Sequence, residues 1–136
     1  MKTAEVIYQG DIRTEAVHLL SKNRILTDGP LDNHGKGEAF SPTDLLATSL
    51  ACCMLSIMGI VAKRDGIAIE GTRAEVTKNM VADPRRVGEI VVEITFPAGT
   101  FSAKEKQILE NAALTCPVAK SLHPDLKQTV SFNYLS

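Results

Sequence analysis

The sequence contains no tryptophan, and aromatic residues of all kinds make up only 4% of its 136 residues. It therefore offers neither the aromatic platform on which nucleic-acid bases stack nor a carbohydrate-stacking surface. It also lacks an excess of either charge, because 15 basic and 16 acidic residues are interspersed and give a formal net charge of −1. That balance predicts no partnership with nucleic acid and none with an anionic membrane surface.

Cysteine is scarce as well, with three residues in the chain. The opening segment MKTAEVIYQGDIR has neither the apolar stretch nor the small-residue cleavage site of a secretory signal. We therefore expect a cytoplasmic protein with reduced thiols. In that compartment a cysteine pair is more typical of catalysis, redox chemistry or metal binding than of a structural disulfide.

The hydrophobic pattern predicts two blocks of strands separated by helices. Strands are expected at 3–9, 14–20 and 24–28, then a polar, glycine-rich loop at 29–40, an antiparallel hairpin of 67–79 with 86–96, and a last strand at 128–135. A capping box of Ser102 and Glu105 opens a helix over 103–114, and Pro117 starts a shorter one. No repeat or linker divides the chain. The order predicts a single α+β domain over 1–136 and not a parallel βαβ fold.

The strongest local signal marks a long helix between the two blocks. Ser41 is a candidate N-cap, Pro42 suits the first helical position, and Asp44 stands three residues after the cap. Gly66 can end the helix in the left-handed conformation. The result is a helix of about 22 residues, roughly 33 Å long. Its charge-free run Leu45–Ala62 approaches the length of a membrane span, but small polar residues interrupt it, so we interpret it as a core helix buried on every side.

Chemistry alone leaves the roles of the cysteines open. Cys116 precedes Pro117 at the N-terminal edge of a short helix, where free N–H groups favour a thiolate, so it ranks above Cys53 as the reactive thiol. Either cysteine could attack and the other resolve. Cys52 and Cys53 lie mid-helix and are also compatible with simple core packing. Being adjacent, their side chains point about 100° apart.

A zinc site is a second interpretation, with Cys52 or Cys53, Cys116 and His123 as ligands. Structural zinc sites normally pair their ligands at C-x₂₋₄-C or H-x₃₋₅-H spacing, and neither spacing occurs here. We therefore expect no metal site and expect His18, His34 and His123 to be surface or loop residues. Nucleophile-elbow, phosphate-loop and dinucleotide motifs are also absent from the sequence.

Several motifs together resemble the OsmC/Ohr family, the osmotically inducible and organic-hydroperoxide-resistance proteins. They are the helix opening SPTDLL, a cysteine ten residues after Thr43, a hairpin, and a later helix that ends at Cys-Pro in CPVAKSL. The segments DNHGKGEAFSPTDLL and CPVAKSLHP look closer to the OsmC-like branch than to the organic-hydroperoxide enzymes.

The resemblance implies antiparallel sheets around a long buried central helix in an interlocked homodimer, with two active sites at the subunit interface. In the family the helix cysteine attacks and the Cys-Pro cysteine resolves, and these positions are Cys53 and Cys116 here. This assignment reverses the ranking from helix electrostatics, which placed Cys116 above Cys53 as the reactive thiol. Cys52 falls where the family has a small residue and is assigned to packing. An arginine from the first strands supports the family's thiolate, and Arg13 matches it best, with Arg24 second.

One position departs from the family pattern. The peroxidases carry a glutamate directly after the helix-opening proline, whereas this chain has Thr43, which cannot form an ion pair with the arginine. Either Asp44 or Glu38 substitutes, or this branch has lost efficient peroxidase activity while keeping its thiols.

The resemblance thus implies reduction of an organic hydroperoxide at a Cys53/Cys116 redox pair, reset by an external dithiol and needing no bound cofactor. The alternative is a non-enzymatic module that binds a small apolar or electrophilic ligand, or senses redox state, in the same pocket at the subunit interface. Thr43 is the residue that keeps this alternative open.

Overall fold

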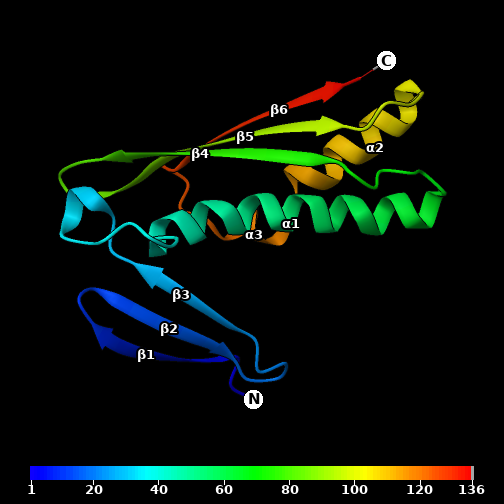
Figure 1. The fold of residues 1–136 in the computed structure, drawn as a ribbon. Helices are drawn as coiled ribbons and strands as arrows, with labels where there is room; N and C mark the ends of the chain where they lie inside the picture. The colour runs from blue at the N-terminus through cyan, green and yellow to red at the C-terminus, as the bar shows by residue number, and fades with distance from the viewer. Residues whose placement is uncertain (136) are drawn as a thin grey trace. The chain divides into compact units, whose positions relative to one another are not determined.

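The computed structural model describes residues 1–135. Its elements are β1 Ala4–Gly10, β2 Arg13–His18, β3 Arg24–Asp28, the 3₁₀ helix η1 Leu31–Asn33, α1 Pro42–Asp65, β4 Arg73–Val81, β5 Arg86–Phe96, α2 Ala103–Leu114, α3 Pro117–Ser121 and β6 Lys127–Tyr134 (Figure 1). Apart from η1, which lies within the predicted loop, this order is the predicted one and confirms the α+β class. The chain divides into two compact units, Met1–Leu46 and a second that begins at Ala47, and each is described by itself. The single domain over 1–136 stays a prediction.

The first unit is an antiparallel sheet in the order β1-β2-β3. The middle strand β2 ends at His18, because Leu19 and Leu20, which we predicted as strand, lie in a turn. The predicted loop at 29–40 follows β3 and folds back on itself. A Cβ atom on Gly35 would lie only 1.7 Å from the carbonyl oxygen of Gly29, so this close backbone approach requires a glycine.

Both ends of α1 form as the sequence predicts. The Ser41 hydroxyl accepts a hydrogen bond from the N–H of Asp44 at 3.0 Å, and the Asp44 carboxylate accepts one from the N–H of Ser41 at 2.9 Å. These two bonds satisfy two of the N–H groups that a helix start leaves without partners. Gly66 follows the last turn with a φ of +69°, the left-handed conformation expected of it.

In the single chain α1 is buried along one face, formed by Ala47, Leu50, Ala51, Met54, Met58 and Ala62. Coverage on every side stays a prediction, because it depends on a partner chain. Leu46, Cys52 and Ile60 are exposed in the single chain. Within the second unit, the sheet and the helices α2 and α3 cover one side of α1.

The second unit contains the sheet β4-β5-β6. β4 and β5 form the predicted antiparallel hairpin, although β4 begins at Arg73 and leaves 67–72 outside the strand. β5 and β6 pair in parallel, with Val92 opposite Val130, so the expectation of purely antiparallel sheets is wrong. The reason is the connection: α2 and α3 carry the chain back across the sheet, which makes β5-α2-α3-β6 a crossover unit.

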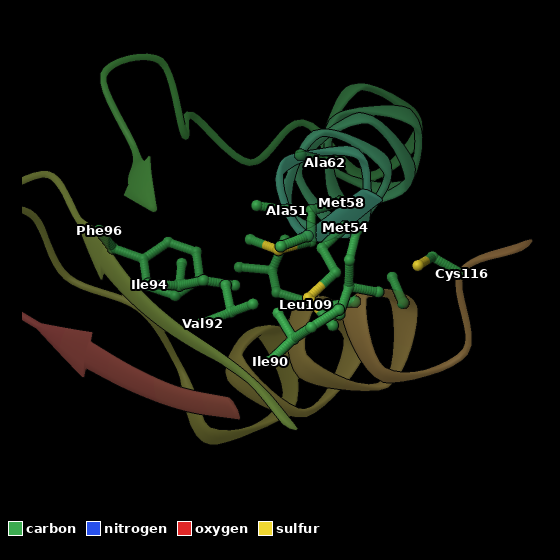
Figure 2. Packing of buried hydrophobic residues seen from close by; sticks show 14 of the residues in the cluster. Ala51, Met54, Met58, Ala62, Ile90, Val92, Ile94, Phe96, Leu109 and Cys116 are labelled. Carbon is green, nitrogen blue, oxygen red and sulfur yellow. The ribbon is translucent and has the colours of Figure 1, made fainter. Parts of the chain in front are cut away.

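The core of this unit lies between the sheet, α1 and α2. Along β5 every second side chain is buried, namely Ile90, Val92, Ile94 and Phe96. They meet Met54 and Met58 of α1 and Leu109 of α2, and Cys116 lies beside this cluster where α2 ends (Figure 2). The segment that carries Cys116 is therefore attached to a close-packed core.

By length and composition α1 could cross a membrane, but the core helix of a soluble protein meets the same criteria. In its most apolar stretch, 33% of the residues are buried. Among residues 1–135 it is the one helix that meets these criteria. Its buried face belongs to the core cluster, which agrees with its interpretation as a core helix.

Candidate redox site

Cys53 of α1 and Cys116 of the α2–α3 break lie together in the second unit. The N–H of Val118, in the first turn of α3, donates a hydrogen bond to the Cys53 sulfur at 3.5 Å. The Cys116 thiol lies close enough to Cys53 and to the N–H groups of Val118 and Ala119 for all three to affect its pKa. Pro117 positions these donors, because a helix that starts there leaves its first N–H groups without carbonyl partners. The structure thus brings together the two cysteines that the resemblance paired.

The environment of Cys116 overturns its ranking from chemistry alone. Its side chain is completely buried, and this desolvation raises the pKa of the Cys116 thiol, against the lowering effect of the nearby N–H groups. The contact with Cys53 raises the pKa further. A helix start was expected to favour a thiolate at Cys116, but burial has the larger effect. Cys116 therefore suits the role of a protonated partner thiol.

Cys52 is not the buried packing residue that we predicted. It is exposed, whereas its neighbour Cys53 is half-buried. The 100° turn between adjacent helix residues explains the difference, because only Cys53 points toward the side on which α3 lies. Two neighbouring cysteines thus have different surroundings.

Arg13, the predicted arginine, lies in the first unit and is paired with two carboxylates. Its Nε and Nη2 donate to the two oxygens of Asp28 at 2.7 and 2.8 Å, and Nη2 also donates to Glu38 at 3.1 Å. These bonds raise the pKa of Arg13, chiefly through Asp28. The second candidate, Arg24, is paired with Glu15 on the neighbouring strand. Arg13 belongs to the first unit, and both thiols belong to the second.

Asp28 is the residue that sequence reasoning missed. It is 1% exposed and stands directly opposite Arg13 in the β2–β3 pairing. The hydrogen bonds from Arg13 hold the pKa of its carboxyl below the usual range, against the effect of burial. An available signal was the position of Asp28 at the end of a predicted strand, where a pairing register would have placed it beside Arg13.

The structure also distinguishes the two acids considered as substitutes for the family's glutamate. Asp44 is engaged in the capping box of α1. Of the two acids, Glu38 is the one that pairs with Arg13, which Asp28 also holds. Thr43 contacts the Ser41 hydroxyl at 3.3 Å.

Within residues 1–135, no group of three or more His, Cys, Asp or Glu side chains could hold a metal ion. His18, His34 and His123 are exposed, as predicted. The chemistry that this arrangement supports is instead that of a dithiol, because two thiols in contact can be oxidised to a disulfide.

A comparison with protein-family models identifies the family. The model described as OsmC-like protein matches residues 35–131 of this chain. The chain belongs to the OsmC-like family. The matched region contains Glu38, Cys53 and Cys116, whereas Arg13 and Asp28 precede it.

Solved structures of OsmC-like proteins share the fold over the whole chain. A crystal structure from Psychrobacter arcticus 273-4, named for a suggested role in osmotic stress induction and detoxification response, is 61% identical, has a TM-score of 0.94 and covers 98% of this chain and 96% of its own. An OsmC-like protein from Mycoplasma pneumoniae is 21% identical, with a TM-score of 0.81 and coverage of 100% and 99%. An organic hydroperoxide resistance protein OsmC from Legionella pneumophila is 17% identical, with a TM-score of 0.75 and coverage of 98% for both chains. No curated protein matches the sequence.

Proposed function

We propose that this OsmC-like chain is a thiol-dependent peroxidase that reduces organic hydroperoxides through Cys53 and Cys116, in oxidative stress defence. The observation that carries the proposal is the contact between a half-buried thiol, Cys53, and a buried one, Cys116, at the start of α3. A peroxidase of this type needs one thiol that the substrate can reach and a second thiol that can close a disulfide with it.

In the proposed reaction the Cys53 thiolate attacks the distal oxygen of the hydroperoxide. The O–O bond breaks, Cys53 becomes a sulfenic acid, and the leaving alkoxide takes a proton from water to become the alcohol. Cys116 then attacks the Cys53 sulfur, water leaves, and a disulfide forms. An external dithiol supplies two electrons and two protons to restore both thiols. The Val118 N–H donates to the Cys53 sulfur and so holds the start of α3 against the attacking residue. No bound cofactor is required.

The names of relatives support the same theme. The Legionella pneumophila protein of the same fold is named for organic hydroperoxide resistance, and the 61% identical Psychrobacter arcticus protein for osmotic stress and detoxification. We extend these names to this chain as a proposal. Cytoplasmic location and the absence of nucleic-acid and membrane partners stay predictions from composition.

The test is hydroperoxide turnover by the purified protein. Adding cumene hydroperoxide without a reductant should consume two thiols per chain, and a supplied dithiol should convert this into multiple turnovers. Thiol loss without turnover in the presence of several dithiols would contradict the peroxidase and favour a redox sensor.

One observation favours the second candidate function, a ligand-binding or redox-sensing module. Arg13 is held by two carboxylates in this structure, so its charge is already compensated before any thiolate or substrate approaches. A protein of this second kind would bind a small apolar or electrophilic compound and show no dithiol-dependent turnover.

We also propose that the protein acts as a homodimer. The first unit's sheet leaves apolar side chains exposed on both faces, with Val6 and Ile25 in one row and Ile7 and Leu26 in the adjacent row. Ile60 of α1 is 64% exposed as well. A second copy of the chain would cover such surfaces. We expect sedimentation at micromolar concentration to give twice the chain mass of 14.7 kDa. A monodisperse monomer would contradict the dimer.

Arg13 provides a further prediction about the thiolate. If Arg13 supports the Cys53 thiolate, Arg13→Ala should slow the alkylation of Cys53 near neutral pH by about tenfold, because a nearby cation favours the reactive anion. Arg13→Lys should fall between, since it keeps the charge but loses the planar fork. Stopped-flow alkylation in a Cys52→Ala background measures this. Alkylation rates equal to that of the wild type in both variants would move this role to Arg24 or to no arginine.

A further inference from the structure

Gln128 is a polar residue in the apolar row of β6. It lies opposite Ile90 of β5 in the parallel pairing, so its side chain is on the face of the sheet that forms the core (Figure 2). Three partly buried core side chains follow it in this row, Val130, Phe132 and Tyr134. An amide on such a face costs free energy unless it finds a hydrogen-bond partner. Gln128 has one, because its Nε2 donates to the carbonyl oxygen of Ala119 in α3 at 2.9 Å.

The helix that receives this bond is too short to hold its position alone. α3 has five residues, far fewer than a helix needs to be stable in water without tertiary contacts. Its last carbonyl groups lack partners within the helix, and Gln128 supplies one of them. The N–H of the same residue, Ala119, lowers the pKa of the Cys116 thiol, so Ala119 lies between that thiol and Gln128. The bond thus links β6 to the segment that carries Cys116.

A second contact to α3 comes from the reacting group itself. The Val118 N–H donates to the Cys53 sulfur at 3.5 Å, and this sulfur is the atom that the proposed reaction oxidises and then joins to Cys116. The bonding of this sulfur therefore changes at each step. The hydrogen bond from Gln128 contains no reacting atom, so it can hold α3 while Cys53 is a thiol, a sulfenic acid or half of a disulfide.

We propose that Gln128 is a positioning residue for disulfide closure, which holds α3 so that Cys116 stays within reach of Cys53. This inference rests on the proposed dithiol reaction. In that step the Cys116 thiolate attacks the sulfenic sulfur, the S–S bond forms, the S–O bond breaks, and the leaving hydroxide takes up the proton that Cys116 released. Closure competes with a second hydroperoxide, which would oxidise Cys53 to the sulfinic acid. A fixed α3 favours closure, because an oriented neighbouring thiol reacts at a high effective concentration.

Gln128→Met tests this role, since methionine has a similar length and no N–H to donate. Closure in a single turnover, followed by mass spectrometry of quenched samples, should slow about five- to tenfold, and the sulfinic acid should accumulate. The rate of hydroperoxide loss in the first turnover should stay within about twofold of the wild type. Gln107→Met is the matched control, because it makes the same change at an exposed position of α2 and should affect neither step. An unchanged closure rate, or an equal loss in both steps, would overturn the positioning role.

Gln128→Glu supplies a readout that a purely structural role would not move. The two side chains have the same shape, but an ionised carboxylate has no proton to donate, whereas a protonated carboxyl group has one. Compared with the wild type at the same pH, closure should be about tenfold slower at about pH 8 and should approach the wild-type rate toward about pH 5, because glutamate protonates near this pH and a carbonyl partner favours the protonated form. A deficit that is constant over this range would overturn the role of the donated hydrogen bond. This variant also tests the proposal if Gln128→Met does not fold.

A thiol–disulfide equilibrium separates failure of this inference from failure of the peroxidase proposal, because it involves no peroxide. The protein, in a Cys52→Ala background, is equilibrated with mixtures of reduced and oxidised dithiothreitol, and the Cys53–Cys116 disulfide is quantified. Gln128→Met should lower the equilibrium constant for disulfide formation about three- to tenfold, and Gln107→Met should not. If hydroperoxide turnover is absent but this constant falls, the positioning role stands and the peroxidase proposal fails. If turnover is present and neither the closure rate nor the constant changes, the inference fails alone.

Discussion

Replacing Cys53 by serine should abolish hydroperoxide consumption by this protein. A serine hydroxyl is about the same size but is not ionised at neutral pH, so the attacking sulfur anion is lost while the α1 packing is kept. We expect at least a thousandfold decrease in the rate of cumene hydroperoxide loss, down to the uncatalysed background, as an order-of-magnitude value. A peroxide assay with excess dithiol measures it directly.

Cys52 provides the matched control for this variant. It adjoins Cys53 but is exposed, so Cys52→Ser changes the same chemical group one residue away. Its activity should stay near that of the wild type. A Cys53→Ser protein that still consumes peroxide, together with an inactive Cys52→Ser protein, would show that the neighbouring cysteine is the nucleophile.

Replacing Cys116 by serine should stop the reaction after one turnover. The sulfenic acid formed on Cys53 would then lack the thiol that contacts it in this structure, and excess peroxide would oxidise it further to the sulfinic acid. In the wild-type protein, peptide mapping by mass spectrometry should find a Cys53–Cys116 disulfide and a reduced Cys52. A dominant Cys52–Cys116 bond would contradict the assignment.

The burial of Cys116 adds a pH dependence to this second step. Because burial raises the pKa of its thiol, Cys116 is mostly protonated at neutral pH, and the anion that attacks the sulfenic acid is its minor form. Disulfide closure in a single turnover should therefore accelerate with rising pH, by about tenfold per unit while the pH stays below this pKa. A closure rate that is flat from pH 6 to about 8 would contradict the control of this step by Cys116 deprotonation.

Only those features of the candidate site that depend on residues adjacent in the sequence could be predicted. Cys116 before Pro117 is recognisable because proline restricts its predecessor and starts a helix. Asp28 was missed because the pairing of β2 with β3 places it opposite Arg13, fifteen positions earlier in the sequence. The register of this pairing cannot be inferred from the sequence of either strand alone. The proposed order, with Cys53 attacking and Cys116 resolving, came from the family resemblance, and the raised pKa of the buried Cys116 thiol supports it.

The sequence by itself determined the elements with strong end signals. The capping boxes at Ser41 and Ser102, the left-handed Gly66 and the start of α3 at Pro117 all form as predicted, because their hydrogen bonds link residues within one turn of each other. Tertiary structure alone decided the parallel pairing of β5 with β6, the one-sided burial of α1 and the two counter-ions of Arg13. These features depend on which distant segments meet, and the free energy of such contacts comes from the burial and charge of both partners together.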